Sequence, residues 1–158
     1  MTSESIGIDL GGTKIEGVRL GPDGNVRHRH RIPTRQEDGY QQILARIEQV
    51  VKELEYGGNP LPLGIGTPGS ISAREGTIKN SNTLCLNGKP LREDLESRLG
   101  RTIQLENDAN CFALAESRLG AGRGTKVLFG VILGTGVGGG IVLDGQLWSG
   151  PQHIAGEW

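Results

Sequence analysis

Two glycine turns constrain this sequence more than any other feature, because each one joins two short apolar runs that have the pattern of strands. Residues 6–9 lead through Gly11-Gly12-Thr13 into an apolar run at 15–20, and residues 127–133 lead through a glycine-rich turn at 134–140 into 141–143. The chain has 27 glycines in 158 residues, and they lie inside or beside apolar runs. That placement predicts tight turns and close approach of the backbone to a ligand.

The remaining periodicity predicts a mixed α/β fold. A third strand at 26–32 completes an antiparallel meander, because parallel neighbours would need long crossovers. Apolar residues recur every three or four positions across 39–56, which predicts a helix. The further expected elements are strands at 63–66 and 102–106, helices at 91–99 and 109–119, and weak strands near 70–71 and 77–78. The final strand pair echoes the first hairpin, which indicates a weak internal repeat with a second lobe beginning near Val127.

Three glycine motifs look like nucleotide-binding fingerprints but do not fit them. The GxGxxG patterns at 64–69 and 134–139 do not open helices, as a dinucleotide fingerprint must. The near P-loop at 7–14 has its threonine and lysine in the wrong order and precedes a strand. What remains is two hairpins whose glycines free backbone N–H groups for an anion, with Asp9 able to hold Mg²⁺ through water. The alternative is that both are ordinary hairpin turns.

Composition excludes several classes of protein. A formal net charge of −1 gives no basic field for nucleic acid. The start of the chain has no signal-peptide pattern and no run is long enough to span a membrane, so we expect a cytoplasmic protein.

Cys85 and Cys111 are expected to be reduced thiols. His28 and His30 alternate with arginines, which favours a solvated basic strand over a metal site, and we predict no metal-ligating cluster.

Four segments, taken together, resemble the ROK family (repressors, open reading frames, kinases). They are residues 6–14, 107–110, 133–140 and 155–157. The resemblance implies the actin-like, ribonuclease-H-like ATPase fold, with two lobes around a cleft. We therefore expect an N-terminal lobe at 1–122, with a mixed five-stranded sheet and helices. The first hairpin of a second lobe, at 123–158, would follow.

The resemblance also implies site residues. Asp108 would be the catalytic base that accepts a proton from the sugar hydroxyl attacking the γ-phosphoryl group of ATP. The ATP phosphates, with Mg²⁺, would be bound by Asp9, Gly11, Gly12, Thr13, Lys14, Gly134, Thr135, Gly136 and Gly138. The sugar would be bound by Gly66, Asn82, Asn107, Asp108 and Glu157. Each has a structural alternative: Asp108 as a helix N-cap, the asparagines as turn residues and Glu157 as a solvated tail residue.

Within the family, segments 68–72 and 79–88 look most like bacterial fructokinases and mannokinases. We therefore predict ATP-dependent phosphorylation of fructose or mannose by a complete enzyme of which this chain is an incomplete N-terminal portion. The alternatives are an N-acetylglucosamine kinase or glucokinase, a non-catalytic sugar-binding module, or a ROK-type transcriptional regulator. The predicted partners are the hexose, ATP and a second copy of the chain, without nucleic acid or membrane. A structural zinc site is expected only in a longer chain, because its motif lies beyond Glu157.

Overall fold

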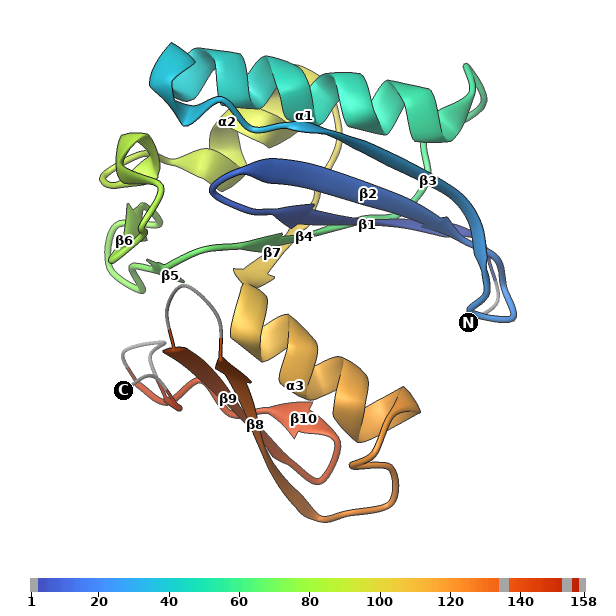
Figure 1. Cartoon of the computed structure of the whole chain (residues 1–158), viewed down its shortest axis with the longest axis vertical. Helices are drawn as coiled ribbons and strands as arrows, with labels where there is room; N and C mark the ends of the chain where they lie inside the picture. The colour runs from blue at the N-terminus through green and yellow to red at the C-terminus, as the bar shows by residue number, and fades with distance from the viewer. Residues whose placement is uncertain (1–2, 134–136, 152–154, 157–158) are drawn as a thin grey trace.

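A mixed five-stranded sheet forms the larger part of the structure, a computed structural model that describes residues 3–133, 137–151 and 155–156. Its strands are β1 (Ser5–Leu10), β2 (Lys14–Leu20), β3 (Val26–Pro33), β4 (Leu63–Thr67) and β7 (Gln104–Asn107), in the order β3-β2-β1-β4-β7. The first three form an antiparallel meander, and β4 and β7 run parallel to β1 (Figure 1). The predicted fold class is confirmed.

Two helices cover one face of this sheet, namely α1 (Tyr40–Glu55) and α2 (Leu91–Leu99) (Figure 1). Alternate residues of β1 and β4 point toward these helices and are buried, because a strand turns every second side chain to the same face. The core formed there includes Ile6, Ile8, Leu10, Ile15, Ile43, Leu44, Ile47, Val50, Val51, Leu54, Leu63, Ile65, Leu91 and Leu95. Gly17 of β2 lies so close to α1 that a Cβ atom there would be 2.6 Å from both Leu54 and Val50.

A second, three-stranded sheet follows α3 (Asp108–Leu119). Its strands are β8 (Val127–Leu133), β9 (Val137–Leu143) and β10 (Gln146–Leu147), in the order β10-β9-β8. The helix packs on β8 and β9, so it leaves β7 and immediately joins the second sheet (Figure 1). The expected division of the chain at 122/123 stays a prediction.

The structure differs from the sequence prediction at the second hairpin. Its return strand begins at Val137 instead of 141, and β10 was not expected. Residues 138–140 are glycines, which suggested a loop, yet they continue the ladder with β8. Gly138 and Gly140 lie against α3, and Gly139 on the opposite face lies against Phe129 and Gly156. The weak strands were real but form a separate pair, β5 (Ser70–Ile71) with β6 (Ile78–Lys79).

Short 3₁₀ turns, η1 (Gln36–Asp38) and η2 (Leu84–Leu86), complete the described elements. Among the described residues, no helix has the length and apolar character needed to cross a membrane.

The close contact between Gly17 and α1 gives a first prediction. Gly17→Ala should lower the free energy of unfolding by about 1–3 kcal/mol, because the new methyl group would overlap Leu54 and Val50. Gly64→Ala in β4 of the same sheet is the matched control, because no atom lies within 4 Å of its Cβ position. Urea unfolding of both variants measures the difference, and equal stabilities would contradict the packing described.

Candidate functional site

The candidate site lies where the three parallel strands end. β1 continues into the loop at 11–13, β4 into Pro68-Gly69, and β7 into Asp108 at the start of α3. The carboxyl ends of parallel strands share one edge of a sheet, which is where α/β proteins bind ligands. The register also places Asp9 beside Gly66, and Gly66 beside Glu106, in one row across the sheet.

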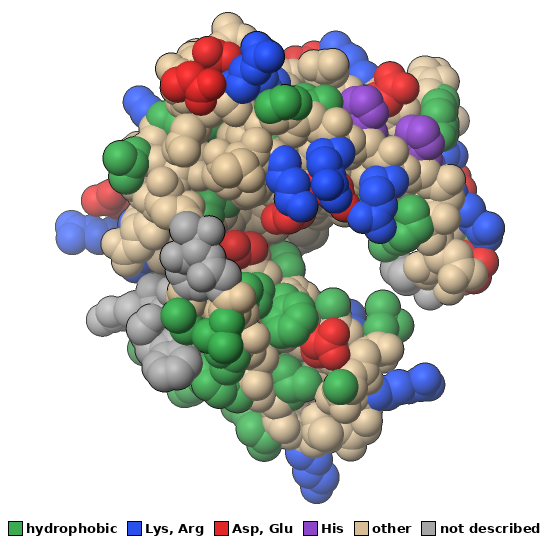
Figure 2. All heavy atoms as spheres, viewed as in Figure 1, with side chains coloured by type: hydrophobic (Ala, Val, Ile, Leu, Met, Phe, Trp, Pro, Cys, Tyr) green, Lys and Arg blue, Asp and Glu red, His purple; other side chains and the backbone are tan. Residues whose placement is uncertain are grey.

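A cleft of about 930 Å³ lies along the sheet face that α1 and α2 leave open. Its walls come from the sheet on one side and from α3, β8 and β10 on the other, and the space-filling view shows the molecule hollowed there (Figure 2). The predicted site residues that line it are Asp9, Gly66 and Asp108. Asn82, Asn107 and the first glycine loop are not part of its lining.

The two aspartates of the cleft influence each other electrostatically. Partial loss of hydration raises the pKa of Asp9, and the negative charge of Asp108 raises it further, while Lys14 lowers it. Desolvation also raises the pKa of Asp108. Hydrogen bonds from backbone N–H groups lower this pKa, but by less than desolvation raises it. Burial raises the pKa of the nearby Cys111 thiol to about 11, so this cysteine is a neutral neighbour. The pair of carboxylates is therefore a place where bound positive charge would be stabilised.

The first glycine loop is held from both sides. The Gly11 N–H donates to the Lys14 carbonyl at 2.9 Å, and the Thr34 hydroxyl donates to the Gly11 carbonyl at 2.6 Å. Thr13 and Lys14 are exposed. Thr83, which sequence reasoning missed, is fully buried beside this loop. Its Oγ1 lies 3.5 Å from the Gly12 Cβ position and has no hydrogen-bond partner among the described residues. No local motif marks Thr83, because this proximity arises only in the folded chain.

Gly134, Thr135 and Gly136 of the second predicted phosphate loop lie outside the described residues. So does Glu157, which was predicted to bind sugar. Gly138 lies within β9, where its Cβ position would be 3.2 Å from Ala109 of α3. The described part of this segment therefore packs a helix, and its role toward phosphate stays a prediction.

The N-cap of α3 is Asn107 and not Asp108, which corrects the alternative considered for Asp108. The Asn107 Oδ1 accepts from the Asn110 N–H at 3.0 Å, and its Nδ2 donates to the Gly69 carbonyl at 2.7 Å. Asp108 is the first helical residue and is exposed at the cleft. Asn107 therefore joins α3 to the loop after β4. Asn82 is exposed, so its side chain is more accessible to a ligand than that of Asn107.

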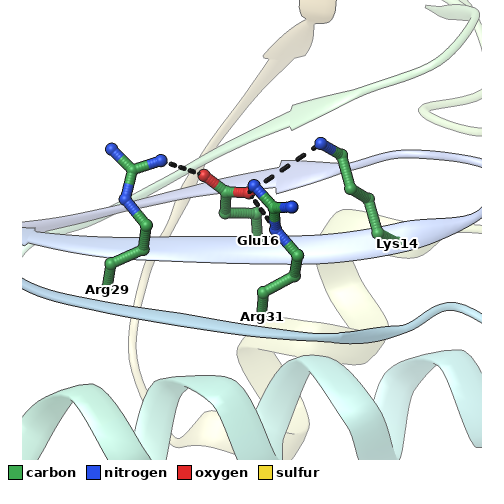
Figure 3. A network of polar contacts seen from close by, with 4 residues as sticks. All are labelled: Lys14, Glu16, Arg29 and Arg31. Atoms are coloured by element: carbon green, nitrogen blue, oxygen red, sulfur yellow. Dashed lines mark hydrogen bonds and ion pairs between the residues drawn. The ribbon is translucent and has the colours of Figure 1, made fainter.

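A charged network borders Asp9 on the same sheet face. Glu16 stands beside Asp9 in the register and accepts hydrogen bonds from Arg29 and Arg31, with the Lys14 ammonium 3.9 Å away (Figure 3). Burial alone would raise the pKa of Glu16, but the arginines lower it. Arg29 and Arg31 remain more than half exposed, as expected of a solvated basic strand, and both also pair with Glu16. On the other face of β3, the rings of His28 and Tyr56 pack with their centroids 4.8 Å apart. Within the described residues, no group of three His, Cys, Asp or Glu side chains could hold a metal ion.

Comparison with known proteins identifies the relatives of this chain. The family model described as "ROK family" matches residues 5–158. The N-acetyl-D-glucosamine kinase of Photobacterium profundum is 41% identical over 152 residues, which cover 96% of this chain and 50% of the relative. The N-acetylgalactosamine kinase AgaK of a Shewanella species is 40% identical over 153 residues, covering 96% and 49%. The chain thus spans about half the length of these curated relatives.

Among solved structures, the chain is similar to a ROK family glucokinase from Streptomyces griseus in complex with glucose and AMPPNP. The TM-score is 0.88 at 31% identity, covering 98% of this chain and 49% of that one. The similarity confirms the actin-like ATPase fold that the sequence motifs indicated.

The cap of α3 gives a second prediction. Asn107→Ala should lower the free energy of unfolding by about 1–3 kcal/mol, because it removes the cap and leaves the partly buried Gly69 carbonyl without its donor. Asn82→Ala, at an exposed position, should stay within about 0.5 kcal/mol of the unsubstituted chain. Denaturant unfolding compares the two, and similar losses in both would argue against the cap.

The raised pKa of Asp108 gives a third prediction. Its ordinary pKa is 3.8, so the folded chain holds this proton more tightly than the unfolded chain, and stability falls as pH rises from 3.8 to the raised folded pKa. Asp108→Asn removes that loss, so its stability relative to the unsubstituted chain should increase with pH in this window. Asp23→Asn should show the opposite trend below pH 3.8, because hydrogen bonds from Asn25 lower the pKa of Asp23, so the unsubstituted chain gains stability as pH rises toward 3.8. Thermal unfolding from pH 3 to 8 measures both, and parallel curves would contradict the assignment.

Proposed function

Because this chain belongs to the ROK family, we propose that it provides the catalytic base and part of the phosphate and sugar sites of an ATP-dependent sugar kinase. One observation carries the proposal. β1 and β7 bring Asp9 and Asp108 to the same cleft, and the glycine loop at 11–13 lies at the same sheet edge. One carboxylate can then serve the sugar hydroxyl while the other lies toward the phosphates.

Asp108 is the proposed general base. Its carboxylate is exposed to the cleft at the rigid junction of β7 and α3, and its raised pKa makes it a better proton acceptor than an ordinary aspartate. It would accept the proton of the attacking hydroxyl, while the N–H groups and the Thr13 hydroxyl of the first loop bind phosphate oxygens.

Asp9 is the proposed residue for Mg²⁺. The carboxylate oxygens suit this hard cation, and the mutual repulsion of Asp9 and Asp108 favours a positive charge near them. Bound Mg²⁺ would supply charge neutralisation for the phosphates.

The comparisons support an N-acetylhexosamine or glucose as substrate better than fructose or mannose. The relatives named above act, by name, on N-acetylglucosamine, N-acetylgalactosamine and glucose. The likeness of segments 68–72 and 79–88 to fructokinases is the weaker indication, because sugars are distinguished by a few hydroxyl contacts that short segments do not fix. We therefore propose N-acetylglucosamine as the first substrate to test.

A non-catalytic sugar-binding module is the second candidate, favoured only by the fact that the chain spans about half of its curated relatives. Such a module would bind sugar without nucleotide turnover.

The fourth prediction tests the kinase directly. We would join the chain to the unmatched half of the Photobacterium profundum enzyme and measure ADP release from Mg-ATP with N-acetylglucosamine, glucose, fructose and mannose. N-acetylglucosamine should give the highest kcat/KM, and Asp108→Asn should lower kcat by about 10²–10⁴-fold.

Asp144→Asn is the control, because it removes the same charge from an exposed turn. Asp144 has a φ of 47°, which asparagine tolerates. A folded chimera that binds sugar but releases no ADP would favour the non-catalytic module. Equal activity of the Asp108 variant would exclude it as the base.

A further inference from the structure

Two buried threonines flank the first glycine loop, and they differ in whether their hydroxyls are paired. Thr34, just after β3, and Thr83, just before η2, are both fully buried. The Thr34 hydroxyl donates to the Gly11 carbonyl at 2.6 Å. The Thr83 Oγ1 lies beside Gly12 but has no partner in the part of the chain that the structure describes. Because an unpaired buried hydroxyl costs free energy, threonine at position 83 is unfavourable for the stability of the chain without ligand.

The segment that carries Thr83 lies beside the turn between β1 and β2 and is held there by hydrogen bonds (Figure 1). The Thr83 N–H donates to the Ser81 hydroxyl oxygen at 3.1 Å, and the Thr83 carbonyl accepts from the Leu86 N–H at 3.0 Å. The Asn87 side chain accepts from the Ser81 N–H and donates to the Ser81 carbonyl, each at 2.9 Å. These bonds fix the backbone on both sides of Thr83, so its side chain is kept against the loop.

The first glycine loop has one peptide that a side chain holds and one that no described side chain holds. In a trans peptide, the carbonyl of one residue and the N–H of the next point in opposite directions. The bond from Thr34 to the Gly11 carbonyl therefore turns the Gly12 N–H away from Thr34. Among the described residues, neither the Gly12 carbonyl nor the Thr13 N–H, which form the next peptide, has a backbone partner. Thr83 lies against this second peptide, as Thr34 lies against the first.

Building on the proposed function, we propose that Thr83 is a positioning residue for the phosphate loop, and that its hydroxyl donates to the Gly12 carbonyl when the loop binds phosphate. This bond turns the Thr13 N–H away from the buried threonine and toward the exposed side of the loop, where a phosphate would approach. The hydroxyl that is unpaired without ligand is paired in the bound state. Thr83 therefore favours the bound arrangement of the loop over the free one.

The neighbouring position separates this role from sugar binding. Asn82 is exposed and is predicted to bind sugar, whereas Thr83 is fully buried. A sugar bound at Asn82 would not reach the Thr83 hydroxyl, which lies beside Gly12 instead. The hydroxyl should therefore affect the nucleotide and not the sugar.

The fifth prediction compares valine substitutions at the two threonines in the 158-residue chain without ligand. Valine has nearly the shape of threonine but lacks the hydroxyl. Thr34→Val should lower Tm by about 3–6 °C, because it leaves the Gly11 carbonyl without its donor. Thr83→Val should leave Tm unchanged or raise it by about 1–4 °C, because it removes an unpaired hydroxyl. If thermal unfolding shows that Thr83→Val also lowers Tm, the hydroxyl already has a partner in the free chain and the proposal is overturned.

Nucleotide affinity gives the second readout, in the chimera with the unmatched half of the Photobacterium profundum enzyme. Thr83→Val should weaken Mg-ATP binding and raise the KM for ATP by about 5–30-fold, while the KM for N-acetylglucosamine stays within about twofold. Thr83→Ser keeps the hydroxyl and should return both ATP values to within about threefold of the unsubstituted chimera. Calorimetry and steady-state kinetics measure these values. A purely structural role would not combine weaker ATP binding with an unchanged or higher Tm.

The proposal for Thr83 and the proposed function fail in different ways. Unchanged Mg-ATP affinity of Thr83→Val in an active chimera would overturn the role of Thr83 and leave the kinase standing. So would a change confined to the KM of the sugar. A chimera that binds Mg-ATP without turnover would contradict the proposed function, and the affinity comparison would still decide the role of Thr83. Absence of Mg-ATP binding would contradict both, and the Tm comparison decides the role of Thr83 if the chimera does not fold.

Discussion

The parallel pairing of β1 with β4, and of β4 with β7, is the constraint on which the rest of this structure depends. It carries three chain segments that are far apart in sequence to one edge of the sheet, and it sets Asp9, Gly66 and Glu106 in one row. Gly66 has no side chain. No side chain at this position of β4 therefore fills the space between the Asp9 carboxylate of β1 and the Asp108 carboxylate at the start of α3. A Cβ atom there would already be 3.6 Å from the Cys111 sulfur and 3.7 Å from the Asp108 Cα.

The row also explains why the charge network around Glu16 matters to Asp9. Glu16 lies beside Asp9 and, by its charge, raises the pKa of Asp9, whereas Lys14 lowers it. Arg29 and Arg31 hold Glu16 ionised and occupy its oxygens, and only 13% of its side chain is exposed. The meander thus does more than extend the sheet, because its third strand fixes the charges that surround a proposed ligand of Mg²⁺ (Figure 3).

Most of the fold could be predicted from periodicity, because alternation in β1 and the three-to-four repeat of α1 report directly on which face is buried. The errors arose where tertiary contacts override local pattern. The glycines at 138–140 suggested a loop but form strand, with Gly138 and Gly140 against the small side chains of α3. Asn107 takes the cap that was considered for Asp108. Asp9 and Asp108 could be proposed from motifs, whereas Thr83 and the network at Glu16 depend on contacts that no local motif contains.

The glycines separate into two physical roles once the sheets are compared. Gly17 under α1, and Gly130 and Gly140 under α3, allow a helix to approach the strands, so their conformational cost is offset by packing. Gly7 and Gly64 lie on the open face of the first sheet, where the Cβ position of Gly64 has no neighbour within 4 Å and that of Gly7 has only Val18, at 3.7 Å. No packing in the described structure explains these two. They leave bare backbone in the wall of the cleft that Asp9 and Asp108 share, which is the surface that a substrate entering the cleft would approach.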